Sequence, residues 1–299
     1  MPVTEVPAGG LGSAIAPEQW AAYVLQHLSA ASVVLASGAT RIDTALRAVH
    51  VPRVLADGGA DWYGELEEIT ENGPDGDELL LVPKKVATLT KLSNEVVADS
   101  SPSVLDTVGT SMVASVALTA DRAILSGTDP KGPVGVYSQA GQHVTGAVTI
   151  DNLIAAAGLV ADVGGQARVA YVNPADHTKL MQEKDGNDRP LLTPDYSGGP
   201  SSTIYGMTIW ATKGIAVDTA LVCAPEQIIV AVRNDPQVAV SQDALFTSDG
   251  AVCRVICRVD AGVNDPSGLV SIGATSETQS MSAQSAKSSK SSKAASSDS

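Results

Sequence analysis

The sequence predicts an α+β protein on three observations. A single apolar helical pattern runs for about 23 residues between Ser101 and Gly127, which is longer than an ordinary globular helix. Strand-like segments lie before and after it, and one pair of them contains a concentrated turn signal. Helices and strands then alternate from Thr149 to Ala211. These patterns favour a mixed fold in which helices pack on sheets.

The long helix has capping signals at both ends. Ser101, Pro102 and Ser103 suit its start, and Gly127 suits its end. Its length predicts a rod of roughly 35 Å. The residues expected to form its buried face are Leu105, Val108, Met112 and Val116, continued by Ala120 and Ala123 and widened by Val104, Leu118 and Leu125.

Residues 55–83 are predicted to form a long two-stranded excursion with its tip in the turn signal at residues 72–77. An isolated two-stranded hairpin is marginal in water, so we expect this one to lie on another subunit. The apolar contacts should be buried there, and the glutamates should either meet basic residues of the neighbour or form a solvated face. The candidate contact residues are Trp20, Trp62, Glu65, Leu66, Glu67, Glu68 and Ile69.

The rest of the chain is predicted as short helices and strands. Thr149 should cap a helix that ends at Gly164, and Asn173 with Pro174 should open another that ends near Glu183. The predicted strands cover residues 168–172, 204–211, 220–223, 227–232, 236–245, 251–259 and 269–272. Residues 274–299 are almost entirely Ser, Ala, Lys, Thr and Gln, so we expect a disordered tail.

Charge and cysteine content disfavour several classes of function. Asp and Glu number 33 against 19 Lys and Arg, and the formal net charge of −14 disfavours electrostatic binding of nucleic acid. Three cysteines do not suit a disulfide framework, and we expect Cys253 and Cys257 to be buried thiols on one strand face. We expect no membrane contact, because neither a long apolar run nor a signal peptide is visible.

No catalytic, cofactor-binding or metal-binding residues are predicted. A Gly-x-Ser-x-Gly motif is absent, and the spacing around Lys131 does not suit a phosphate-binding loop. Cys253 and Cys257 lack a second pair of ligands for zinc. The four histidines are scattered, but a triad that uses His143 stays open because triads assemble in space.

Several short segments, taken in their order along the chain, resemble the major capsid proteins of tailed phages, which have the Hong Kong 97-type fold. Residues 93–100 (SNEVVADS) resemble the approach to the long spine helix of that family, and residues 121–127 (DRAILSG) resemble its end. Residues 60–65 (ADWYGE) resemble the outgoing part of its extended loop, and residues 171–176 (YVNPAD) a strand-to-helix step of its axial domain. The match runs from about Thr40 to Ile272.

The resemblance implies a role for each segment. Residues 1–36 correspond to an N-terminal arm, 37–54 to the entry into a peripheral domain and 55–83 to an extended loop hairpin. Residues 84–134 correspond to the peripheral domain with its long spine helix, and residues 135–234 to the axial domain. Residues 235–273 would be the return strands of the peripheral domain, ahead of the tail at 274–299.

The resemblance also implies a structural protein rather than an enzyme. Copies would self-assemble into hexamers and pentamers that form the icosahedral head of a tailed bacteriophage and enclose its double-stranded DNA without specific binding. Expected partners are a portal protein and a separate scaffolding or decoration protein, and the virion would be assembled in the host cytoplasm. Covalent Lys–Asn linking is not expected, since no Lys lies between Arg53 and Pro83.

Two alternative functions stay open. The same fold builds encapsulins, which are bacterial compartments that hold a protein cargo, and this is the nearer alternative. The other is a cytosolic hydrolase with an unrecognised site.

Overall fold

The computed structural model describes residues 32–56, 61–65, 71, 73, 75–93, 104–184, 192, 202–233, 237–245 and 249–274. These residues fall into two compact units. The first contains the described residues up to Ile124, together with Thr128–Pro133 and Ile229–Gly262. The second contains Leu125–Gly127, Val134–Ile228 and the described residues from Val263 onward.

The first unit is built on a five-stranded sheet whose central strand is the 14-residue β12 (Gly250–Val263). Its order is β1 (Thr40–Thr44), β10 (Ile228–Arg233), β12 and β11 (Gln237–Leu245), and β4 (Lys84–Ser93) pairs with the other edge of β12. Strand β1 is parallel to β10, whereas β4 and β11 are both antiparallel to β12. The short helix α3 (Val33–Ala36) precedes the sheet.

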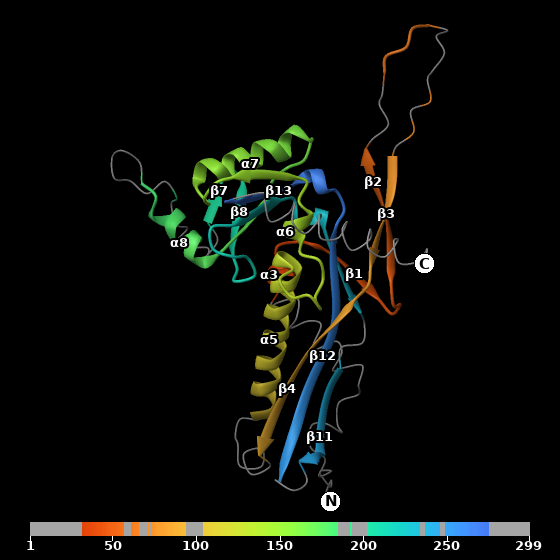
Figure 1. Cartoon of the computed structure of the whole chain (residues 1–299), viewed down its shortest axis with the longest axis vertical. Coiled ribbons are helices and arrows are strands. Elements are labelled where there is room, and N and C mark those ends of the chain that lie inside the picture. Colours follow the sequence, from red (N-terminus) through yellow and green to blue (C-terminus); the bar gives the residue numbers. More distant parts are fainter. Residues whose placement is uncertain are drawn as a thin grey trace, which may run out of the picture. The chain divides into compact units, whose positions relative to one another are not determined.

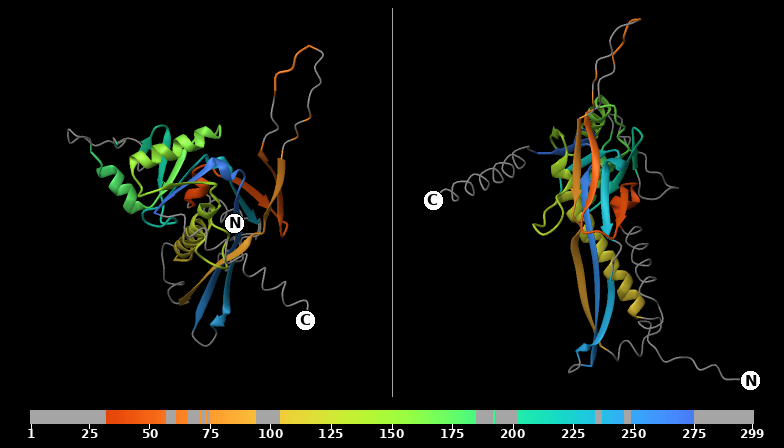
Figure 2. Two further views of the ribbon diagram at one scale, coloured as in Figure 1. Left: turned by 45° about the horizontal axis from the view of Figure 1, so that its top comes forward. Right: turned by 90° about the vertical axis from the view of Figure 1, so that its right-hand side faces the viewer.

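Where they pair, strand β4 and residues Ala251 to Val259 of β12 alternate between two faces, as the period of a strand requires. On one face the β12 positions are buried, and this face lies beside helix α5 (Val104–Ser126) (Figures 1 and 2). Its members are Ala251, Cys253, Val255 and Cys257, opposite Leu92, Thr90, Thr88 and Val86. The prediction that Cys253 and Cys257 are buried thiols on one face is confirmed.

Helix α5 confirms the predicted long helix, with 23 residues that end immediately before Gly127. Met112, Val116 and Ala120 are buried as expected, and Val108 is half-buried. The side chain of Leu105 lies outside the described residues, so its place in the core stays a prediction. A second buried row was not expected, and it comprises Val113, Ala117, Asp121 and Ile124.

Leu118 was wrongly expected to widen the buried face of α5. Its side chain is 51% exposed, because the residues that turn inward at this point are Val116, Ala117 and Ala120. Leu125, which was also expected to widen this face, is fully buried as predicted.

Gly127 ends α5 in the left-handed conformation, with φ of +62°. The close approach of Gly135 adds a second requirement for glycine. A Cβ atom on Gly127 would lie 2.3 Å from the Gly135 nitrogen, and one on Gly135 would lie 2.4 Å from the Ser126 carbonyl carbon. Both positions therefore need glycine for space, and Gly127 needs it for conformation as well.

A two-stranded ribbon, β2 (Val49–Ala56) with β3 (Asp75–Leu81), extends from the first unit (Figure 1). It confirms the expected hairpin, but its bounds differ from the prediction. Pairing begins at Val49 with Leu81, six residues before the expected start. Asp75, Gly76 and Asp77 are paired strand residues, so the predicted tip at 72–77 is wrong and the turn lies between Ala56 and Asp75.

The second unit contains a six-stranded sheet. Its order is β5 (Gln142–Thr145), β13 (Leu269–Gly273), β9 (Ala220–Cys223), β6 (Val169–Val172), β8 (Met207–Ala211) and β7 (Ser202–Ile204). Helices α6 (Val136–Gln139), α7 (Ile150–Asp162) and α8 (Pro174–Gln182) accompany it. The predicted caps are confirmed, because Thr149 accepts from the Asn152 amide and Asn173 from the Ala175 amide.

Two expectations for the later strands are corrected. Residues 204–211 do not form one strand, because Tyr205 and Gly206 have φ of +48° and +82° and turn the chain between β7 and β8. The closing strand β13 was expected among the return strands of the first sheet, but it pairs with β5 and β9 in the second. Conversely β10, expected within residues 135–234, lies in the five-stranded sheet.

The buried face of α5 predicts a strong and position-dependent effect of truncation. Met112 is buried and Leu118 is exposed on the same helix. Met112→Ala should lower the free energy of unfolding of the unassembled subunit by about 2–5 kcal/mol, because it leaves a cavity in the core. Denaturant titration followed by circular dichroism measures this difference.

Leu118→Ala is the matched control and should cost under about 1 kcal/mol, as exposed substitutions do. Equal costs for the two variants would contradict this placement of the helix.

Candidate functional site

The base of the β2–β3 ribbon is held by apolar packing inside the first unit. Alternate ribbon residues face the same way, and Val49, Val51, Leu79 and Leu81 pack in one cluster with Ile42, Ile229 and Ala231. Gly262 on β12 lies directly beneath them. A Cβ atom at Gly262 would lie 2.8 Å from Leu79 Cδ2 and 3.0 Å from Leu81 Cδ2. The ribbon therefore sits on a site where the sheet carries no side chain.

Charged pairs fix the register of the ribbon. The Arg53 guanidinium lies 2.7 Å from the Asp77 carboxylate, directly across the strand pair. The hydrogen bond from Arg53 lowers the pKa of Asp77. His50 lies against Glu78 on the outward-facing side. Both pairs lie at strand residues on either side of the ribbon, next to Gly76, which is paired with Val54.

The junction between the ribbon and β4 is held by a buried carboxylate. Asp260 accepts a 2.6 Å hydrogen bond from the amide of Val82 and one of 3.0 Å from that of Ala261. Burial raises the pKa of Asp260. Just beyond, Lys84 donates to the carbonyl of Gly132. The direction in which the ribbon leaves the sheet is thus set by contacts at its base.

Several described side chains of the ribbon and of the excursion beyond it are exposed. Trp62 is fully exposed, Glu65 is exposed, and Leu80 on β3 is more than half exposed. Such an exposed tryptophan is the kind of side chain that dominates interfaces. The other candidate contacts, Trp20, Leu66, Glu67, Glu68 and Ile69, lie outside the described residues and stay predictions.

Asp121 on α5 forms a link that the sequence analysis missed. Its Oδ1 accepts a 2.5 Å hydrogen bond from the Ser32 hydroxyl, and its Oδ2 accepts one of 2.6 Å from the Val33 amide. Ser32 in turn caps α3 by accepting from the Leu35 amide. Asp121 is 1% exposed. The link joins the start of the described chain to the long helix.

Burial raises the pKa of Asp121 to about 6, although hydrogen bonds from Ser32 and Val33 act in the opposite direction. The available signal was the position of an acidic residue in line with Val113 and Ala117 on an apolar helix. An unpartnered carboxylate is costly there, which implies a partner that sequence spacing does not reveal.

Residues Val108–Ser126 of α5 are long and apolar enough to cross a membrane by length and composition alone. The core helix of a soluble protein passes the same test. Two observations identify it as a core helix. Met112, Val116 and Asp121 are buried, and Asp121 accepts hydrogen bonds from Ser32 and Val33.

The chemistry visible in the described part of the chain is structural. His143 Nδ1 lies 3.0 Å from Ser271 Oγ, the nearest approach to the triad that was left open. Ser271 is fully buried and donates to the Gln142 carbonyl, so it cannot meet a substrate. Among these residues no group of three or more His, Cys, Asp and Glu side chains could hold a metal ion.

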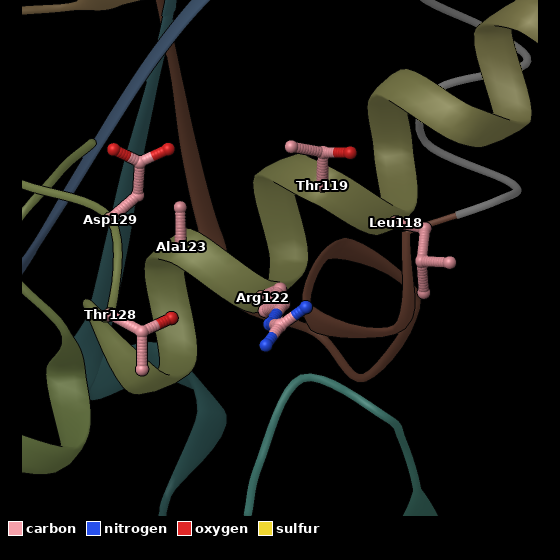
Figure 3. Close-up of a pocket in the computed structure, with 6 residues that line it drawn as sticks. All are labelled: Leu118, Thr119, Arg122, Ala123, Thr128 and Asp129. Carbon is pink, nitrogen blue, oxygen red and sulfur yellow. The ribbon is translucent and has the colours of Figure 1, made fainter. Parts of the chain in front are cut away.

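An open pocket of about 420 Å³ lies beside α5 in the first unit (Figure 3). Its lining residues are Leu118, Thr119, Arg122, Ala123, Thr128 and Asp129. Figure 3 shows the Arg122 guanidinium and the Asp129 carboxylate set apart, with Ala123 between them. The lining offers no convergent set of polar groups of the kind that orients a small ligand.

The buried Asp121 predicts a dependence of stability on pH. Its pKa is about 6 in the folded protein against an ordinary value of 3.8. The folded protein therefore favours the protonated carboxyl of Asp121. The stability that this proton contributes is fully present below about pH 4 and is lost as the pH rises through 6. The free energy of unfolding of wild type minus that of Asp121→Asn should fall by on the order of 3 kcal/mol between these limits.

Denaturant titrations of the unassembled subunit at several pH values measure this difference. Asp162→Asn, which changes an exposed carboxylate, is the control and should track the wild type throughout. A constant difference between wild type and Asp121→Asn would contradict the burial of an ionisable group at this position.

Comparison with known proteins identifies the family. A model of the phage capsid family matches residues 12–273. A search of curated proteins finds no match. A solved structure from Microbacterium phage Oxtober96 has a TM-score of 0.66 at 19% identity, over 81% of this chain and 90% of that one. One from Mycobacterium phage Bobi has a TM-score of 0.64 at 20% identity, with 81% and 90% coverage.

A structure described as the capsid of a native GTA particle, computed with C5 symmetry, covers 91% of this chain and 95% of its own. Its TM-score is 0.63 at 15% identity. At such identities the likeness establishes the fold, whereas the family model covers most of the sequence. The chain therefore belongs to the phage capsid family and has the Hong Kong 97-type fold of phage major capsid proteins.

Proposed function

We propose that this protein forms hexamers and pentamers that close the icosahedral head of a tailed phage around double-stranded DNA. The family supports the coarser statement that it is a capsid shell protein. The GTA capsid structure was computed with C5 symmetry, which supports a fivefold arrangement for this chain too. The net charge of −14 suits enclosure of DNA better than binding to it.

The observation that carries this proposal is the β2–β3 ribbon. Its base is packed on the sheet, but its outer part carries a fully exposed Trp62 and has no other layer to lie on among the described residues. A two-stranded ribbon is marginal in water. A second copy of the chain would supply the missing layer.

The segment roles follow from the same proposal. Residues 1–36 serve as the arm, 55–83 as the extended loop, 135–234 mainly as the axial domain, and 84–134 with 235–273 mainly as the peripheral domain. Two strands modify these bounds, because β10 lies in the five-stranded sheet and β13 lies in the six-stranded sheet. The proposal includes a portal protein, a separate scaffolding or decoration protein and assembly in the host cytoplasm.

Particle formation tests the proposal directly. Purified protein should sediment as megadalton particles that contain nuclease-protected DNA when isolated from a productive infection. Small oligomers alone would contradict the shell, and particles filled with a protein cargo in place of DNA would contradict the phage head.

Trp62→Ala tests whether the ribbon contributes to the shell. The variant should give at least about tenfold fewer particles, because loss of a buried aromatic contact costs more than 1.4 kcal/mol. Quantitative sedimentation measures the yield. Leu46→Ala, which truncates a side chain that is 70% exposed outside the ribbon, is the control and should assemble normally. Equal yields for both variants would contradict the role of Trp62.

We expect the shell to be held without covalent links between subunits. The nearest lysine to the excursion is Lys84, which comes nine positions after the last ribbon pair at Asp75, a distance of about 30 Å at the rise of a strand. One side chain does not reach that far. Particles boiled in detergent and reductant should run as a single band near 30.4 kDa, and a ladder of larger bands would show this expectation to be wrong.

A further inference from the structure

The described residues begin with a short helix that its own sequence does not stabilise. Helix α3 contains four residues, and an isolated helix of that length is not stable in water. Gly38, with φ of +102°, separates α3 from β1 and lets the chain turn there. Val34 is fully buried, whereas Ala36 is exposed. The position of α3 therefore depends on its contacts with the rest of the first unit.

The polar part of these contacts is a single carboxylate on α5. Asp121 Oδ1 accepts the hydrogen bond of 2.5 Å from the Ser32 hydroxyl, and Oδ2 accepts the one of 2.6 Å from the Val33 amide. Both carboxylate oxygens thus face α3, and the Asp121 side chain is 1% exposed. Movement of α3 away from α5 would therefore give water access to this carboxylate.

The contact favours the protonated carboxyl over the ionised one. Burial raises the pKa of Asp121 to about 6 and outweighs the hydrogen bonds from Ser32 and Val33, which favour the ionised form. No charged side chain contributes to this shift. Helix α3 has no titratable residue, and Arg122, the other charged side chain described on α5, is exposed. An ionised Asp121 is therefore stabilised when water reaches it.

We propose that the Asp121 contact is an acid-operated latch, which holds α3 on α5 when the carboxyl is protonated and lets α3 open about Gly38 when it is ionised. The raised pKa fixes the direction, because the stability of the closed form is fully present below about pH 4 and is lost as the pH rises through 6. Helix α3 supplies no strand to the five-stranded sheet, so opening leaves every strand pair in place and is local.

The latch bears on assembly through the residues that precede Ser32. The proposed function assigns residues 1–36 to an arm, and this consequence rests on that proposal. With the latch closed, the arm would start from Ser32 on α5, and with the latch open it would start from Gly38. Acidic and neutral media would therefore favour different starting points for the arm.

Native-state hydrogen exchange of the unassembled subunit tests the latch. The reporters are the amides of Ala36 and Ser37, which donate to carbonyls within α3. After correction for the intrinsic effect of pH on exchange, their opening constant should rise about tenfold between pH 5 and pH 8. Low concentrations of denaturant should hardly change this opening, because little surface becomes exposed. Opening of the β12 amides should depend on denaturant strongly.

Three variants separate the effect of the Asp121 carboxylate from other effects of pH. Asp121→Asn cannot ionise, so its α3 opening constant should be independent of pH. Asp162→Asn changes an exposed carboxylate in the second unit and is the control, which should show the same rise as the wild type. Ser32→Ala removes one hydrogen bond to Asp121 and the cap of α3, so it should raise the opening constant at least about threefold at pH 8.

A wild-type opening constant that stays the same between pH 5 and pH 8 would overturn the latch, and this result needs no variant. Protection and denaturant dependence equal to those of β12 would overturn it as well, since α3 would then open only on global unfolding. The same rise with pH in a folded Asp121→Asn subunit would assign the titration to another group and end the proposal. Failure of the wild type to form particles would contradict the shell function alone, because every exchange measurement uses the unassembled subunit.

Discussion

The packing of Leu79 and Leu81 over Gly262 determines where the β2–β3 ribbon leaves the sheet, and the proposed assembly depends on that direction. A side chain at position 262 would fill the space that these leucines occupy. The Asp260 carboxylate adds a polar contact next to this apolar one by accepting from the Val82 amide. Together they hold a ribbon that has no stable position of its own.

The long helix carries the other constraint on the first unit. Asp121 fixes the start of the described chain through Ser32 and Val33, and it does so from within an apolar row. A buried carboxylate lowers stability at neutral pH, so its hydrogen bonds contribute position more than free energy.

The predictable parts of the fold were those with strong local signals. The 23-residue helix, the Gly127 stop and the caps at Thr149 and Asn173 follow from residue type and spacing alone. The position of the ribbon turn did not follow in this way, because Asp75, Gly76 and Asp77 pair with β2 despite being residue types that favour turns. The sheet that each of β10 and β13 joins is likewise decided by long-range pairing that apolar strands do not encode locally.

The candidate interface was likewise predictable only where the signal was local in the sequence. Trp62 could be selected from sequence, and the structure places it in solvent. The grouping of Lys85 and Lys91 on β4 with Arg254 and Arg258 on β12 could not be, because the two pairs lie more than 160 residues apart in the sequence. Only the register of the two strands brings these four side chains to one surface.

Hydrogen–deuterium exchange of residues 57–74, compared between unassembled subunits and intact particles, tests most directly whether a second copy supports the ribbon. If it does, amides of this segment should exchange rapidly in the free subunit and become protected in the particle. Equal and rapid exchange of the segment in both states would contradict the account.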